Sequence, residues 1–114
     1  MVEAGGGEAR APDPAVIFAA LGDPVRFDLI ERLGDGRARP IASLAAGAPI
    51  TRQAIARHLQ VLERAGLISR AREGRESRIS LDPRPLRAAI DRLAAISGQW
   101  DDALERLRAF VERN

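Results

Sequence analysis

The C-terminal third of this 114-residue chain carries a regular apolar repeat that limits how the chain can fold. The spacing alternates between four and three residues, which is typical of a helix packed along its length on another helix. The eight positions hold Leu86, Ile90, Leu93, Ser97, Trp100, Leu104, Leu107 and Val111. A helix over residues 83–112 extends roughly 40 Å at ~1.5 Å per residue, more than a domain this small can cover. The sequence therefore predicts a dimerisation helix that pairs with a second copy of the chain, and Gly98 leaves open whether it is continuous.

Composition excludes several classes of protein. The chain has no cysteine, which rules out disulfides and thiolate metal sites. It has no apolar run long enough to cross a membrane, and residues 1–10 lack the apolar core of a secretory signal, so we expect a cytoplasmic protein. Residues 1–12 are rich in glycine and small residues and are expected to form a disordered tail. We assign residues 13–112 to one folded domain.

Positive charge is concentrated in one part of the chain. Every basic residue is an arginine, which the coding bias of a GC-rich genome explains, so the positions of the arginines say more than their number. Between Ile50 and Leu81 there are seven arginines and three acidic residues, a local charge of +4. The whole chain carries only +2, so the remainder is net negative. A local basic stretch of this kind indicates nucleic-acid binding.

Capping residues divide the N-terminal half into short helices. Two Asp-Pro pairs, at 13–14 and 23–24, place an N-cap residue before a proline that suits the first helical position. The predicted helices cover residues 14–21, 24–33, 40–46 and 51–65. Two of them are expected to bury an apolar stripe: Phe27, Ile30 and Leu33 in one, and Ile55, Leu59 and Leu62 in the other. Arg26 is expected to have a structural role.

The last two of these helices predict a helix-turn-helix. In that motif the second helix enters the major groove, and its N-terminal residues meet base edges. Arg52 suits the O6 and N7 atoms of guanine, whereas Gln53 suits the N6 and N7 atoms of adenine. Free N–H groups at the helix N-terminus, which Thr51 is expected to cap, add a place for a phosphate. The candidate contacts on this helix are Thr51, Arg52, Gln53, Ala56, Arg57 and His58.

Residues 67–81 predict a β-hairpin. Two short alternating segments, 67–73 and 76–81, flank the turn signal Glu73-Gly74-Arg75. Arginines at 70, 72, 75 and 78 suit a wing that lies along the DNA backbone or in the minor groove, and the candidate contacts are Arg72, Arg75 and Arg78. The predicted fold is therefore a mainly α winged helix-turn-helix with a small β-hairpin wing and a long C-terminal helix.

The sequence also resembles the ArsR-type winged-helix repressors over residues 14–112. The resemblance lies in FAALGDPVRFDLI at 18–30, ITRQAIARHLQVL at 50–62 and AGLI at 65–68. It implies a homodimer built from the first and last helices, and repression relieved by a signal. Two recognition helices in such a dimer predict a palindromic operator of double-stranded DNA. The interface residues it implies are Val16 and Phe18 together with Leu86, Ile90, Leu93, Trp100, Leu104, Leu107 and Val111.

This chain departs from the metal-sensing relatives. The short helix before the turn has no thiol and the last helix has no histidine, so we predict no metal and no other cofactor, and the inducer is unknown. An enzyme is not expected, because there is one histidine and no cysteine or glycine-rich phosphate loop leading into a helix. His58 either contacts a phosphate, senses pH or bonds locally. Two alternatives remain: a winged-helix protein-interaction module, and a metal sensor using only carboxylates such as those of Asp101, Asp102 and Glu105.

Overall fold

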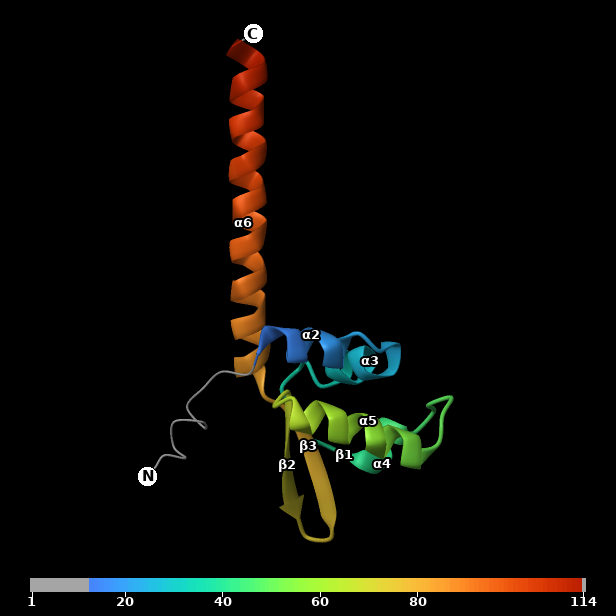
Figure 1. Cartoon of the computed structure of the whole chain (residues 1–114). Coiled ribbons are helices and arrows are strands. Elements are labelled where there is room, and N and C mark those ends of the chain that lie inside the picture. The colour runs from blue at the N-terminus through green and yellow to red at the C-terminus, as the bar shows by residue number, and fades with distance from the viewer. Residues whose placement is uncertain (1–12, 114) are drawn as a thin grey trace, which may run out of the picture.

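The computed structural model describes residues 13–113, and the tail expected over residues 1–12 lies outside this range. Figure 1 shows a small body of short helices and a hairpin, from which one long helix extends. The elements in chain order are α2 (Pro14–Leu21), α3 (Pro24–Arg32), β1 (Arg39–Pro40), α4 (Ile41–Ala45), α5 (Arg52–Arg64), β2 (Ile68–Glu73), β3 (Glu76–Leu81) and α6 (Pro83–Arg113). This arrangement confirms the predicted mainly helical winged helix-turn-helix.

Side-chain caps fix where the short helices begin. Asp13 accepts a hydrogen bond from the N–H of Ala15 at 2.9 Å and begins α2. Asp23 begins α3 by accepting from the N–H groups of two residues in its first turn, at 2.8 and 3.1 Å. The Thr51 hydroxyl accepts from the N–H of Ala54 at 3.1 Å and begins α5. Each cap satisfies a donor that the helix itself leaves without a partner.

The core lies where α2, α3, α4 and α5 meet the sheet. Ile55, Leu59 and Leu62 are buried, as the sequence predicts, and they pack with Leu29 of α3 and Leu44 of α4. One face of α5 is thereby fixed against the body. The opposite face is left for contacts outside the molecule.

The expectation that Phe27 faces inward is wrong. Its side chain is 49% exposed, whereas Leu29, Ile30 and Leu33 are buried. With 3.6 residues per turn, the inward stripe of α3 runs through positions 26, 29, 30 and 33, and Phe27 lies outside it. Arg26 occupies the position of that stripe nearest the helix N-terminus.

The wing contains a strand that the sequence pattern did not reveal. The sheet has the order β1-β3-β2, and β1 pairs antiparallel with β3 through Arg39↔Ile79 and Pro40↔Arg78. A two-residue strand is too short to show alternation, and Pro40 fits there because it occupies an edge strand. The other two strands form the predicted hairpin, in which Glu73 pairs with Glu76 across a two-residue loop. Gly74 takes a positive φ of 63° in that loop, a conformation that glycine adopts readily.

The last helix is continuous through Gly98 over 31 residues. Only its first turns pack on the body of the same chain, where Pro85 and Ala89 are buried and Leu86 is partly buried. Beyond Ala89 the helix extends away from the body, as Figure 1 shows. No helix between residues 13 and 113 is long and apolar enough to cross a membrane.

Candidate nucleic-acid interface

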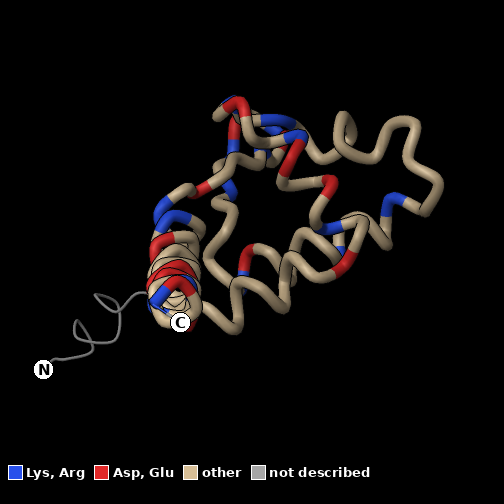
Figure 2. Tube along the Cα trace, turned by 90° about the horizontal axis from the view of Figure 1, so that it is seen from above, with Lys and Arg blue, Asp and Glu red and all other residues tan. Residues whose placement is uncertain are grey.

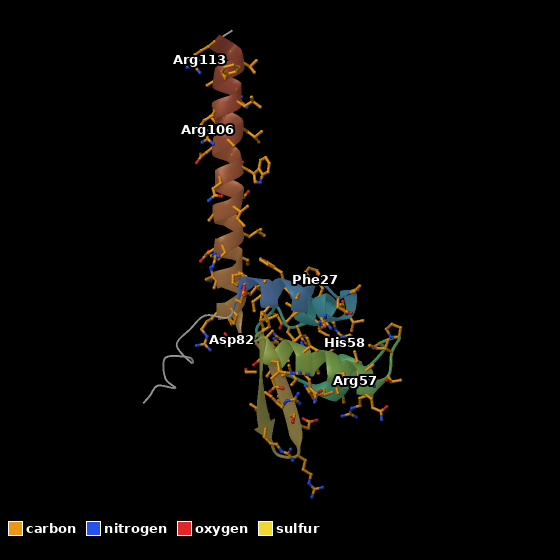
Figure 3. The ribbon with its side chains drawn as sticks, viewed as in Figure 1. Phe27, Arg57, His58, Asp82, Arg106 and Arg113 are labelled. Atoms are coloured by element: carbon orange, nitrogen blue, oxygen red, sulfur yellow. The ribbon has the colours of Figure 1, made fainter. Side chains whose placement is uncertain are left out.

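The N-terminal end of α5 presents polar side chains to solvent. Arg52, Gln53 and Arg57 are exposed and Ala56 is half-buried. Together with Ile41 at the start of α4, residues 51–53 and 56 line a shallow hollow between the two helices. Figure 3 shows Arg57 directed away from α3, toward the side on which the hairpin extends. This is the geometry of a helix end that can approach a groove.

The wing arginines fall into two pairs with different surroundings. The Nε atom of Arg78 lies 3.0 Å from Glu73 Oε1, and its Nη2 lies 3.4 Å from Glu76 Oε1. Arg70 is likewise paired, with its Nη2 3.2 Å from Glu63 Oε1. Arg72 and Arg75 are exposed, and neither has a carboxylate at ion-pairing distance in the part of the chain that the structure describes. The charges available to a phosphate on the wing are therefore those of Arg72 and Arg75.

The structure places His58 on the inner side of α5. Its Nδ1 atom lies 3.8 Å from Asp23 Oδ1 and 3.5 Å from Arg26 Nη1, and its side chain is 22% exposed. Figure 3 shows His58 on the side of α5 that faces α3, away from Arg57. Of the three roles considered for His58, phosphate contact, pH sensing and local bonding, the geometry fits local bonding to other side chains.

Asp23 and Arg26 hold this corner together. The Arg26 Nε donates to the carbonyl of Ala20 at 2.6 Å, at the end of α2, which agrees with the structural role expected for this arginine. The N–H of Arg26 hydrogen-bonds Asp23 and lowers the pKa of that carboxyl below its ordinary value. Burial opposes this effect, while the N–H of Val25 and the charge of His58 add to it. Spacing along the sequence gives no sign of this corner, because its residues come from different helices.

The charged residues of α6 are nearly balanced in sign, unlike those of the helix-turn-helix and wing. Figure 2, which looks down on the molecule, shows basic and acidic segments mixed along α6. The segment from Ile50 to Leu81 has an excess of arginine instead. The excess positive charge therefore lies on the elements that would meet DNA, and not on the long helix.

Comparison with known proteins identifies the family. A profile described as a helix-turn-helix domain matches residues 21–70. The HTH-type transcriptional regulator Rv2034 of Mycobacterium tuberculosis is 37% identical over 108 residues, which cover 90% of this chain and 91% of the relative. A solved ArsR-like transcriptional regulator from a Rhodococcus species has a TM-score of 0.74 and 34% identity, covering 85% and 91% of the two chains. This chain belongs to the ArsR family. It is a transcriptional regulator with a helix-turn-helix DNA-binding domain, which is not an enzyme class.

A metal-sensing relative offers a useful contrast. The solution structure of CmtR from Mycobacterium tuberculosis, described as a cadmium metal sensor, is 36% identical with a TM-score of 0.53 and covers 66% of this chain and 77% of its own. The present ArsR-family chain has no cysteine. Within residues 13–113, no three His, Asp or Glu side chains gather where they could hold a metal ion. Asp101, Asp102 and Glu105 therefore do not form a cluster of that kind.

The residues expected at the ArsR dimer interface lie on two helices. On α2, Val16 and Phe18 are 48% and 40% exposed. On α6, Leu86 packs against the core of its own chain. The other expected residues are all more than half exposed: Ile90, Leu93, Trp100, Leu104, Leu107 and Val111. Ile96 and Phe110 extend the same exposed apolar face, which is broader than the repeat alone indicates.

Proposed function

We propose that this protein is a dimeric repressor of its own or neighbouring genes that binds a palindromic operator without needing a metal. The observation that carries the proposal is the exposed N-terminal end of α5, with Arg52, Gln53 and Arg57, together with a wing whose loop holds Arg75. A guanidinium without a carboxylate partner is free to bind phosphate or guanine. A repressor acting on bacterial DNA works in the cytoplasm.

The candidate contacts have two different roles in this proposal. Arg52 and Gln53 read base edges, because they occupy the first turn of the helix that enters the major groove. Arg72 and Arg75 neutralise phosphates, which adds affinity but carries no sequence information. Arg78 contributes less because two glutamates already hold it. Thr51 orders the helix end. Ala56 has a small side chain that lets the helix approach the groove, and His58 packs on the side of α5 that faces α3.

A gel-shift titration on DNA from the protein's own promoter region tests these roles. Arg52→Ala and Gln53→Ala should each reduce discrimination against mutated operators, by about 1–3 kcal/mol for each base that is no longer read. Arg75→Ala should weaken binding to all sequences alike and make the affinity less sensitive to salt. Arg37→Ala is a matched control, since Arg37 is exposed but lies outside the helix-turn-helix and the wing. Equal behaviour of all four variants would refute the assignment.

The exposed apolar faces of α2 and α6 support the dimer. Two subunits joined along them would present two recognition helices to one face of DNA, with half-sites about 34–36 Å apart. Light scattering at micromolar protein concentration should give twice the mass of the chain. A single-chain mass would contradict the dimer and with it the palindromic operator.

The proposal of metal independence rests on the lack of cysteine in the sequence and on the lack of a metal-binding group of His, Asp and Glu side chains within residues 13–113. Operator affinity should stay the same across zinc, nickel, cobalt and cadmium salts and after treatment with a chelator. A metal that released the protein from DNA would overturn this part of the proposal and favour a sensor built from carboxylates alone.

A further inference from the structure

A hollow lies between α2 and the C-terminal end of α5, at the end of α5 remote from Arg52. Its volume is about 350 Å³, within the range of small-molecule sites. Five apolar or small residues line it: Val16, Ala19, Ala20, Val61 and Ala65. Nothing in the DNA-binding role described above requires a hollow at this place.

Two guanidinium groups complete the lining, to which no carboxylate of residues 13–113 contributes. Arg26 enters from α3 and Arg64 from the last turn of α5. The Nε and Nη2 atoms of Arg26 donate to the carbonyls of Ala20 and Ala19, at 2.6 and 3.5 Å, so backbone contacts fix the position of this guanidinium. No acidic side chain between residues 13 and 113 lies at ion-pairing distance from Arg64, and the neighbouring Glu63 is paired with Arg70 instead.

The other charged and titratable groups near the hollow come from α3 and α5. Asp23, which caps α3, lies close enough to Arg26 to balance part of its charge. On α5, His58 Nδ1 lies 3.5 Å from Arg26 Nη1. The α2 side supplies only apolar side chains and backbone carbonyls. The net charge at the rim is therefore positive, and most of it belongs to Arg64.

We propose that this hollow binds a small organic anion, a carboxylate carrying an apolar chain. The apolar chain would lie on the small side chains, where it leaves water. The carboxylate would accept hydrogen bonds from Arg64, since a guanidinium presents paired donors that match the two oxygens. Arg26 adds a second positive charge at a fixed position.

The position of the hollow would allow a bound ligand to affect DNA binding through α5. It joins α2, where Val16 belongs to the expected subunit interface, to α5, which carries the base-reading residues. A ligand shifts an equilibrium only if it binds two arrangements with different affinity, and a site shared by two helices meets that condition when the helices move. This second step rests on the proposed function, whereas the binding step does not.

Calorimetric titration of the full chain, without DNA, tests the binding step. Sodium hexanoate is the probe, with hexan-1-ol and hexylamine as neutral and cationic probes of the same length. Hexanoate should bind, and the other two should bind at least about tenfold more weakly, because neither carries the negative charge that strengthens hydrogen bonds from a guanidinium.

Three variants locate the site. Arg64→Gln should weaken hexanoate binding about tenfold or more. Arg37→Gln, which removes an exposed arginine outside the hollow, should leave it unchanged. Ala19→Leu should abolish binding by filling the space while keeping both arginines, and the exposure of Ala19 makes this change compatible with the fold. Circular dichroism checks that each variant is folded.

The proposal fails if hexanoate gives no binding heat, if hexylamine binds equally well, or if the two arginine variants lose affinity alike. Operator affinity measured with and without hexanoate then tests the second step. Binding of hexanoate without any change in operator affinity would leave the site standing and refute the signalling role. A chain that binds hexanoate but no DNA would refute the proposed function and leave the site intact.

Discussion

The arginines near α5 differ in what surrounds them, and these surroundings decide what each can do. Arg26 and Arg78 are held by groups of their own chain, while Arg52 and Arg75 face solvent. The sequence pattern predicts His58 and Arg78 as DNA contacts like the others, because residue type and spacing along one element do not reveal a partner from another. His58 lies 35 positions after Asp23 in the sequence, yet the two side chains face each other.

Acidification should destabilise the protein through three aspartates that accept backbone hydrogen bonds. Arg26 and Arg37 donate backbone N–H groups to Asp23 and Asp35, respectively, and these hydrogen bonds hold the pKa of each carboxyl below its ordinary value of 3.8. Hydrogen bonds from the side chain and the N–H of Arg84 do the same for the pKa of Asp82. A folded-state pKa below the unfolded value contributes stability that is complete above the unfolded pKa and is lost as the pH falls through the folded one.

Urea titrations between about pH 6 and about pH 3 measure this effect. The unfolding midpoint of the unmodified protein should fall as the pH drops, and it should fall less in Asp23→Asn. Asparagine is a suitable control substitution because it still caps a helix but does not titrate. Parallel curves for the two proteins would contradict the assigned role of Asp23.

At the scale of elements, arginines satisfy the C-terminal ends of neighbouring helices. Arg26 binds the last turn of α2. Arg32 donates to the carbonyls of Leu44 and Ser43 in α4, at 2.9 and 3.2 Å. Arg39 donates to the carbonyl of Arg32 at the end of α3. Because these carbonyls have no partner within their own helix and carry partial negative charge, a cation there is doubly favourable.

Replacing Arg32 by methionine should therefore destabilise the fold. The change keeps most of the apolar stem but removes two hydrogen bonds to α4, which predicts a loss of about 1–3 kcal/mol in the free energy of unfolding. Urea denaturation followed by circular dichroism measures it, with Arg37→Met as the matched control. A loss no larger than that of the control would show that the hydrogen bonds to Ser43 and Leu44 contribute little.

Replacing Gly98 on α6 should stabilise the protein, in contrast to the change at Arg32. A Cβ atom added there meets nothing within 4 Å, and the helix passes through this residue without a break. Gly98→Ala should therefore raise the free energy of unfolding by about 1 kcal/mol, the difference in helix propensity. Thermal unfolding at fixed protein concentration measures it. A lower melting temperature would mean that a second subunit approaches the backbone closely at this position.

Most elements of this fold could be predicted from local signals. The Asp-Pro pairs and Thr51 mark helix starts that the capping hydrogen bonds confirm. Strand β1 could not be predicted, because two residues carry no period and only pairing with β3 makes them a strand. The prediction for Phe27 was wrong because a spacing of three residues and a spacing of four both fit a helical stripe. Spacing alone therefore did not decide which residue of the first turn faces the core.

At the scale of the whole molecule, the exposed face of α6 is an apolar surface that one chain leaves uncovered. Trp100, Leu104 and Leu107 are each more than half exposed in a row along one helix. A row of this kind is costly in water and favours association. The sequence repeat predicts this face.

Leu104→Glu tests that association. A charge within the repeat should shift the protein to monomers in light scattering and lower operator affinity at least about tenfold, since a monomer reaches only one half-site. Ala109→Glu introduces the same side chain at an exposed position outside the repeat and should leave both properties unchanged. Dimers of normal DNA affinity in the first variant would exclude α6 as the principal interface.

The short strand β1 has a consequence for the shape of the operator. It leads directly into α4 and is paired with β3, so the helix-turn-helix and the wing are joined through a common sheet. In the proposed complex, the distance between the groove that α5 enters and the phosphates that Arg75 contacts is thereby set by the protein. Each half-site must match that distance. If a single base pair is inserted between the groove and those phosphates, the protein should be able to contact the groove or the phosphates but not both.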